Sequence, residues 1–156
     1  DALMTIGADL MVTTVEGVHA DTLVPRVQPM VNAATLHAAP KITPAHVLID
    51  PSGPTTRVHD LVRGMSPHPG AWCMLQWNDR PAIPFKVLRT AHTTMMDVSA
   101  AGSVVLRDGH LFMACADGWL ELLEVQQEGR KRMSAAEFSR GLQHVERLVA
   151  TRGEVV

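Results

Sequence analysis

The sequence is poor in cysteine and contains no metal-binding motif, and these absences argue against a disulfide-rich protein and against a metal-binding protein. Cys73 and Cys115 are its only cysteines. Both lie in apolar, strand-like runs without the paired spacing of a zinc ribbon or a disulfide framework, so we expect two buried thiols. The eight histidines form no His-x-x-x-His or His-x-Glu pair, and no pair of carboxylates stands in a setting that suggests a cleft. The sequence therefore predicts no metal site.

The sequence also has no apolar stretch close to the roughly 18 residues of a membrane-spanning helix, and no signal peptide with a cationic start. We therefore expect a cytoplasmic protein without a membrane segment. With 156 residues, of which 46% are apolar, the chain has the composition of one modest folded domain with an extension. Its first residue is Asp1 and not Met, which we interpret as a sign that the sequence is a fragment of a longer protein.

The net charge of −2 gives the chain no overall basic character. Its first 21 residues hold four of the 16 acidic residues and neither lysine nor arginine. The remainder carries all 14 basic residues against 12 acidic ones, an excess too small to predict a nucleic-acid-binding surface by itself. Any surface for a polyanion must therefore be local.

Three consecutive cations, Arg130, Lys131 and Arg132, precede a predicted helix. Ser134 followed by Glu137 has the spacing of a capping box, in which each side chain accepts a hydrogen bond from a backbone N–H at the helix start. We expect one face of this helix to pack on the core through apolar residues three and four apart: Phe138, Leu142, Val145, Leu148 and Val149. The cations would then lie in solvent at an ordered point of the fold and could bind a polyanion, with a solvated turn as the alternative.

The N-terminal part of the sequence predicts a helix and a linker. Apolar residues at helical spacing over positions 3–14 indicate an amphipathic helix that we expect to end near Gly17. Residues 18–42 show no sustained period and contain three prolines, which is typical of a linker between domains. A second helix is expected over residues 54–63, ending at Gly64.

From residue 71 onward the pattern is that of short strands. Tight hairpins are predicted at the dipeptides Asn78-Asp79, Asp108-Gly109 and Asp117-Gly118. They separate five strand-like runs: 72–75, 83–90, 102–106, 111–114 and 119–125. Five short strands and a closing helix indicate a small barrel, although periodicity alone does not distinguish a barrel from a small sandwich.

The string GRKRMSAAEFSRG at residues 129–141 resembles the C-terminal signature of the methionyl-tRNA formyltransferases. Further blocks occur upstream in the order of that family, at residues 39–43 (APKIT), 49–50 and 63–72 (RGMSPHPGAW). Residues 117–118 and the following Leu120, Leu122 and Gln127 match the last hairpin of the family. The order of these blocks makes the resemblance specific, whereas any one alone would be weak.

The resemblance implies a mainly β fold with flanking helices, namely a small oligonucleotide-binding-like (OB-like) barrel of the formyltransferase C-terminal type. It divides the chain into the last helix of an N-terminal formyltransferase domain (1–17), an interdomain linker (18–53) and a C-terminal barrel domain with a role in tRNA binding (54–156). Two positions depart from the family pattern: Pro51 and His68 stand where the family commonly has Trp and an aromatic residue.

The resemblance also implies the activity of the parent enzyme. This family transfers a formyl group from 10-formyltetrahydrofolate to the amino group of methionyl-initiator tRNA in translation initiation. The Asn, His and Asp that carry this chemistry lie in a nucleotide-binding-like N-terminal domain, and no matching block occurs in this sequence. We therefore expect the missing domain to bind the folate donor, the parent enzyme to be monomeric, and this chain alone to be inactive.

Two alternative functions remain open. One is the C-terminal domain of a sugar-nucleotide or other 10-formyltetrahydrofolate-dependent formyltransferase, against which the signature around residues 130–133 argues. The other is a non-catalytic interaction barrel, which would bind its partner without strong dependence on salt.

Initiator tRNA would contact basic side chains of this chain. The candidates are Lys41, Arg63, Lys86, Arg89, Arg130, Lys131 and Arg132. By resemblance, Lys41 is the linker lysine that lies near the tRNA acceptor arm. Arg63 follows a predicted helix end, where it could instead complement the helix dipole. Lys86 and Arg89 are three residues apart in a predicted strand, so we expect them on opposite faces of the sheet.

The three tryptophans could stack on bases or belong to the core. In strands of a small barrel a core position is the usual one, and we expect it for Trp72 and Trp119. Trp77, beside a predicted hairpin turn, is the candidate for stacking on a base.

Overall fold

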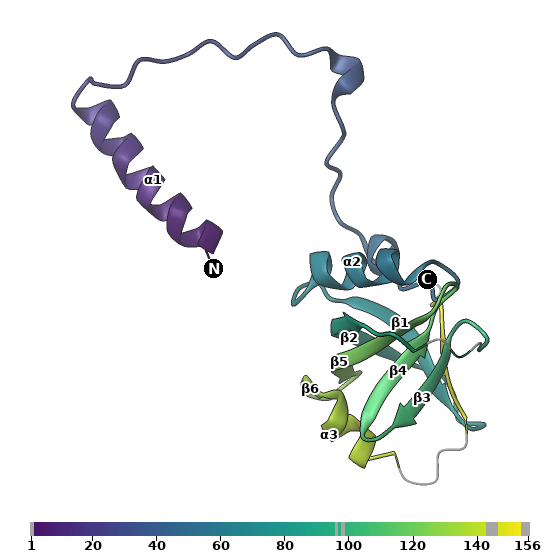
Figure 1. Ribbon diagram of the computed structural model, residues 1–156. Helices are drawn as coiled ribbons and strands as arrows, with labels where there is room; N and C mark the ends of the chain where they lie inside the picture. The colour runs from purple at the N-terminus through teal and green to yellow at the C-terminus, as the bar shows by residue number, and fades with distance from the viewer. Residues whose placement is uncertain (1, 96, 98, 143–146, 154–156) are drawn as a thin grey trace. The chain divides into compact units, whose positions relative to one another are not determined.

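The computed structural model describes residues 2–95, 97, 99–142 and 147–153 (Figure 1). It divides into two compact units, Asp1–Pro40 and Lys41–Val156.

The first unit consists of helix α1 (Ala2–His19) and an extended segment with a short 3-10 helix, η1 (Ala33–Thr35). α1 continues past Gly17, whose carbonyl accepts a hydrogen bond of 2.9 Å from the backbone N–H of Thr22. None of the described residues of α1 is buried, and its large apolar side chains are exposed. Within its own unit, the apolar stripe that predicted this helix therefore has nothing to pack against.

The second unit is a closed antiparallel β-barrel (Figure 1). Its strands follow the order β2-β1-β7-β3-β4-β5, and pairing of β5 with β2 closes the sheet. A two-residue strand, β6, extends the sheet at β5. The strands are β1 (Ala71–Trp77), β2 (Ile83–His92), β3 (Ser103–Arg107), β4 (His110–Ala114), β5 (Trp119–Gln127), β6 (Met133–Ser134) and β7 (Leu148–Thr151). The prediction of a small OB-like barrel with flanking helices is thus confirmed.

Alternate residues of each strand fill the barrel because successive side chains of a strand point to opposite faces. In β1, for example, Ala71, Cys73 and Leu75 are buried and the residues between them are not. The predicted burial of both cysteines is confirmed. Burial raises the pKa of Cys73 to about 12, and burial together with the nearby charge of Asp117 raises the pKa of Cys115 to about 11.

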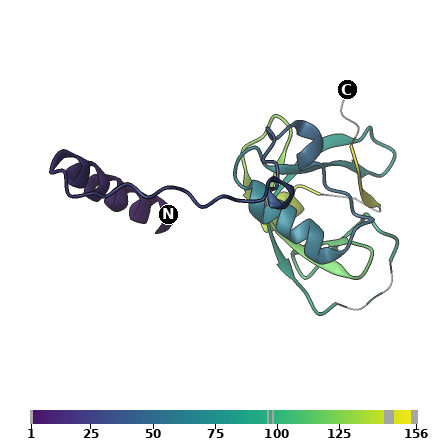
Figure 2. The same cartoon turned by 90° about the horizontal axis from the view of Figure 1, so that it is seen from above.

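Two helices cover the barrel. α2 (Thr55–Met65) packs on β2 through Val58 and Val62, and the view of Figure 2 shows it lying across the strands. α3 (Ala135–Arg140) inserts Phe138, whose ring centroid lies 5.0 Å from that of Phe85. The segment before α2 contains a short 3-10 helix, η2 (Pro44–Val47), and joins the sheet where Ile49 N–H donates to the Trp72 carbonyl over 2.8 Å.

Two helix predictions are wrong in extent. α2 does not stop at Gly64 but continues to Met65, and the Ser66 N–H then bonds the Val62 carbonyl. α3 ends at Arg140, so Leu148 and Val149, which were predicted to continue its apolar face, belong to strand β7 instead. Val145 lies outside the described residues.

The physical reason for the second error is barrel closure. β7 pairs with β1 on one side and with β3 on the other, and it fills the gap between them. Leu148 and Ala150 point inward and are buried, as period-two alternation requires. Spacings of three and four along the sequence did not reveal this, because the partners of β7 are far away in the chain.

Candidate nucleic-acid interface

The predicted basic cluster, Arg130 to Arg132, lies in the turn between β5 and β6 and is exposed. Backbone and side-chain hydrogen bonds fix the turn: Arg130 N–H donates to the Gln127 carbonyl at 3.0 Å, and Gln126 Nε2 donates to the Arg130 carbonyl at 2.9 Å. Gly129 occupies the left-handed region at φ 70°, which glycine adopts without steric cost. The cations therefore project from an ordered turn.

The capping box that follows the cluster is confirmed. Glu137 N–H donates to Ser134 Oγ at 3.2 Å, and Ser134 N–H donates to Glu137 Oε2 at 2.8 Å. The Glu137 carboxylate also accepts a hydrogen bond from the Ser134 hydroxyl at 2.8 Å. The two hydrogen bonds that this carboxylate accepts from Ser134, first from the backbone N–H and then from the hydroxyl, lower the pKa of Glu137. The start of α3 thus holds the C-terminal side of the basic turn.

The three cations of the cluster differ in their surroundings. Arg132 Nε pairs with Glu124 Oε1 of β5 at 2.9 Å. Neither Arg130 nor Lys131 forms an ion pair with any residue that the structure describes. Arg130 and Lys131 are therefore available to an external anion, while Arg132 is partly neutralised.

Lys86 and Arg89 lie on the same face of β2, and the prediction of opposite faces is wrong. Lys86 is opposite Gln126 and Arg89 is opposite Glu124 in the β2–β5 register. Gln126 and Glu124 are two residues apart, so their side chains lie on one face of β5. Directly opposed residues lie on the same face of a sheet, so Lys86 and Arg89 lie on this face as well. The cause is a bulge in β2 between Val87 and Arg89 that shifts the register by one residue.

The outer face of β1, β2 and β5 carries a groove beside the basic turn. One part of it, about 430 Å³, is lined by Trp72, Pro84, Lys86, Gln126, Gln127, Glu128 and Gly129. A second part, about 230 Å³, shares Trp72 and Lys86 and extends to Ile42, Thr43 and Pro44. We call this surface the barrel groove. It extends from Ile42, which follows Lys41, to Gly129, which precedes Arg130.

The position of the ammonium group of Lys86 within the barrel groove is fixed. Its Nζ donates to the Pro69 carbonyl at 2.8 Å, in the turn that precedes β1. Trp72 is half-buried and presents part of its indole to the groove, so the prediction of a core position holds for it only in part. Gly153 packs against this ring so closely that a Cβ there would lie 2.6 Å from Trp72 Cζ3.

The remaining predicted contacts lie outside the groove lining. Lys41 is exposed at the first position of the second unit, next to groove residue Ile42. Arg63, in the last turn of α2, pairs with Asp60 at 3.1 Å, and both side chains are mostly exposed. The structure thus brings Lys86, Arg89 and the basic cluster to one side of the barrel and gives Arg63 a local partner.

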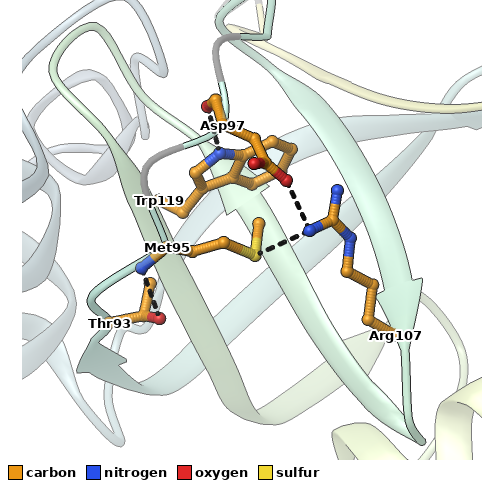
Figure 3. Close-up of polar contacts among 5 residues, drawn as sticks. All are labelled: Thr93, Met95, Asp97, Arg107 and Trp119. Carbon is orange, nitrogen blue, oxygen red and sulfur yellow. Dashed lines mark hydrogen bonds and ion pairs between the residues drawn. The ribbon is translucent and has the colours of Figure 1, made fainter.

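Trp119 is a core residue, as predicted, and is 3% exposed. Its Nε1–H donates to the Asp97 carbonyl at 2.8 Å, and Arg107 binds both the Asp97 carboxylate and Met95 Sδ (Figure 3). These contacts tie the segment between β2 and β3 to the barrel. Arg107 is thus paired with an acidic residue of this segment.

Sequence reasoning missed two cations near Trp77, namely Arg80 in the turn between β1 and β2 and Arg147 before β7. The Asn78 N–H donates to the Arg147 carbonyl at 2.8 Å, and the Arg147 N–H donates to Asn78 Oδ1 at 3.1 Å. The predicted hairpin dipeptide Asn78-Asp79 stands directly before Arg80 and was the sequence signal for it. No pattern in the sequence indicated that Arg147 lies beside this turn.

Among the described residues, no group of three or more His, Cys, Asp or Glu side chains is arranged to hold a metal ion. In the same part of the chain, no helix has both the length and the apolar character needed to span a bilayer.

Comparison with known proteins agrees with the barrel and with the motif order. Residues 41–143 match the family described as "Formyl transferase, C-terminal domain". The chain is 40% identical over 139 residues to the methionyl-tRNA formyltransferase of Solibacter usitatus (strain Ellin6076), covering 89% of this chain and 42% of that protein. It is 37% identical over 144 residues to that of Chlorobium chlorochromatii (strain CaD3), covering 92% and 44%.

A third relative is the methionyl-tRNA formyltransferase of Brucella ovis, 36% identical over 141 residues, with 90% of this chain and 44% of that protein covered. The chain therefore spans less than half the length of the relatives that it matches. The resemblance inferred from the sequence is confirmed, and the chain belongs to the formyl transferase C-terminal domain family.

Proposed function

We propose that this chain is the tRNA-binding part of a methionyl-tRNA formyltransferase. The parent enzyme would transfer a formyl group from 10-formyltetrahydrofolate to the amino group of methionyl-initiator tRNA. The donor would bind to a part of the parent enzyme outside this chain, and no residue described above is assigned to the chemical step. The relatives named for this activity, which extend well beyond the matched region, support the proposal.

The observation that carries the proposal is the barrel groove with the basic cluster at its end. Arg130 and Lys131 lack an acidic partner among the described residues, and their turn is ordered on both sides. Phosphate contacts by such cations release condensed counterions, which supplies affinity without base specificity. A half-buried indole and a fixed ammonium in the groove add a stacking surface and a point charge.

The contribution of this chain to catalysis would be positioning. When a large RNA is held in a fixed orientation, its aminoacyl end already lies near the reacting groups. Less rotational and translational freedom is then lost when the reactive complex forms. Lys41, Arg63, Lys86, Arg89 and the basic cluster are proposed as tRNA contacts. We expect Arg63 to contribute least, because Asp60 already pairs with it.

The proposal is tested by replacing Arg130, Lys131 and Arg132 together with alanine and measuring the affinity for initiator tRNA over a range of salt concentrations. Each lost phosphate contact lowers the slope of log affinity against log salt by about 0.7 to 0.9. Since Glu124 already neutralises part of Arg132, we expect affinity to fall and the slope to decrease by roughly 1.5 to 2.5 units.

A control variant replaces Arg57 and Arg152, two exposed cations that line a different cavity beside α2, and so removes two positive charges where the triple variant removes three. This variant should keep nearly the full slope. Unchanged affinity and slope in the triple variant, or an equal loss in the control, would contradict the assigned interface. Absence of tRNA binding by the unmodified chain would contradict the proposed function itself.

A further inference from the structure

A second groove lies on the other side of the basic turn, between the β1–β2 turn and α3. It encloses about 710 Å³, within the range of volumes that hold small ligands. Its lining residues come from three separate parts of the chain: Trp77, Asn78 and Arg80; Gln127, Arg130 and Met133; and Glu137, Phe138, Gly141 and Leu142. We call it the α3 groove.

The walls of the α3 groove combine an aromatic surface with cations at its edges. Trp77 is the last residue of β1 and is half-buried against the core, together with Met133 and Leu142. Arg80 and Arg130 are exposed and belong to the two turns that border the groove. Each turn is closed by a backbone hydrogen bond, from Arg80 N–H to the Trp77 carbonyl at 3.2 Å and from Arg130 N–H to the Gln127 carbonyl at 3.0 Å.

The carboxylate in the groove is already engaged. Glu137 Oε2 accepts hydrogen bonds from both the N–H and the hydroxyl of Ser134 at 2.8 Å. It is not paired with Arg80 or Arg130, which lack an acidic partner among the residues the structure describes. The groove therefore carries a net excess of positive charge at its edges.

From this arrangement we propose that the α3 groove binds one unpaired nucleotide of an RNA, with the base against Trp77 and the flanking phosphates near Arg80 and Arg130. This inference rests on the proposed function, since it extends the RNA-binding surface past the basic turn. Stacking of a base on an aromatic side chain is tolerant of sequence and combines naturally with cations that follow the backbone. An apolar peptide segment fits less well, because it would desolvate two arginines without providing an anion.

The test uses the full chain and two probes, a blunt RNA hairpin and the same hairpin with a short single-stranded extension. One stacked base should tighten binding of the extended probe by about fivefold or more. Trp77→Ala should remove this gain and Trp77→Phe should keep part of it. Because Trp77 also packs on the core, thermal melting must show that the variant is folded.

Arg80→Ala tests the same groove without altering the core, because the side chain is exposed and the turn uses only its backbone. It should lower the salt slope by about 0.7 with the extended hairpin and leave the blunt hairpin unaffected. Arg57→Ala makes the same change in charge beside α2, and it should have the same effect on the binding of both probes.

A direct readout separates this inference from the proposed function. Titration with cytidine monophosphate should shift the indole N–H resonance of Trp77, which is assigned as the peak missing from the Trp77→Phe spectrum. If tRNA binds but the extension adds no affinity and this resonance does not move, the nucleotide site is refuted while the proposed function stands. If the resonance moves but no tRNA binds, the nucleotide site stands and the proposed function fails.

Discussion

Glu124→Gln should strengthen binding to initiator tRNA, although Glu124 is a partner in an ion pair. Its carboxylate holds Arg132 at 2.9 Å beside the barrel groove, and the two side chains are 26% and 62% exposed. Loss of the negative charge frees Arg132 for a phosphate, which should steepen the salt slope by about 0.7 to 0.9. An exposed ion pair contributes at most about 1 kcal/mol, so affinity should rise by up to about fivefold.

Glu121→Gln is the matched control for this prediction. Glu121 lies on the same strand and the same outward face, opposite Ala91, but its carboxylate bonds His110 Nδ1 at 2.6 Å instead of a cation of the cluster. Both variants change the net charge equally, so the difference between them isolates the release of Arg132. Fluorescence anisotropy with labelled tRNA at several salt concentrations measures it. Equal slopes in the two variants, or weaker binding by Glu124→Gln, would refute the reasoning.

Further predictions concern the fold that positions the interface. Gly102→Ala should lower the melting temperature strongly, because Gly102 has φ 87° and a Cβ there would collide with a backbone carbonyl of β7; a calorimetric scan measures this, and unchanged melting contradicts it. Ser134→Ala should cost about 1 kcal/mol of stability, seen as a shift in denaturant midpoint. Since Ser134 lowers the pKa of Glu137, the part of the cap stabilisation that depends on the ionised carboxylate is complete above the ordinary pKa of a glutamate and is lost as pH falls through the lowered value; melts over acidic pH should show the difference between the two proteins becoming smaller. Cys73 and Cys115, with pKa values raised to about 12 and about 11, should resist alkylation at mildly alkaline pH until denaturant is added, and rapid labelling of the folded chain would oppose their burial.

The features that the sequence predicted correctly depend on neighbours a few residues apart. The capping box at Ser134 and Glu137 needs only their spacing, and the hairpin dipeptide Asp108-Gly109 adopts the positive φ angles, 50° and 81°, that a two-residue turn requires. At Asn78-Asp79 the first residue alone has a positive φ, and the connection to β2 is longer, over residues 78–82. The density of positive charge at residues 130–132 is likewise visible without any structure. Local chemistry therefore determined the basic turn and its support.

Tertiary structure decided how these local parts combine. β7 replaced the end of a predicted helix, because only a strand between β1 and β3 closes the barrel. A bulge beside Leu88 moved Lys86 and Arg89 to one face, which period-two counting cannot predict. Both outcomes depend on pairing between segments far apart in the chain.

The two grooves show most clearly which features depend on the sequence alone and which depend on tertiary structure. The barrel groove joins Trp72, Lys86 and Gln126 from three strands, and the α3 groove brings Trp77 and Arg80 opposite α3. The sequence by itself determined which residues carry charge and aromatic surface and where turns and caps form, because these properties are set by side-chain chemistry and short-range hydrogen bonds. Only the closed barrel decided which of those residues face one another, because inter-strand register and helix packing are set by burying the whole core at once.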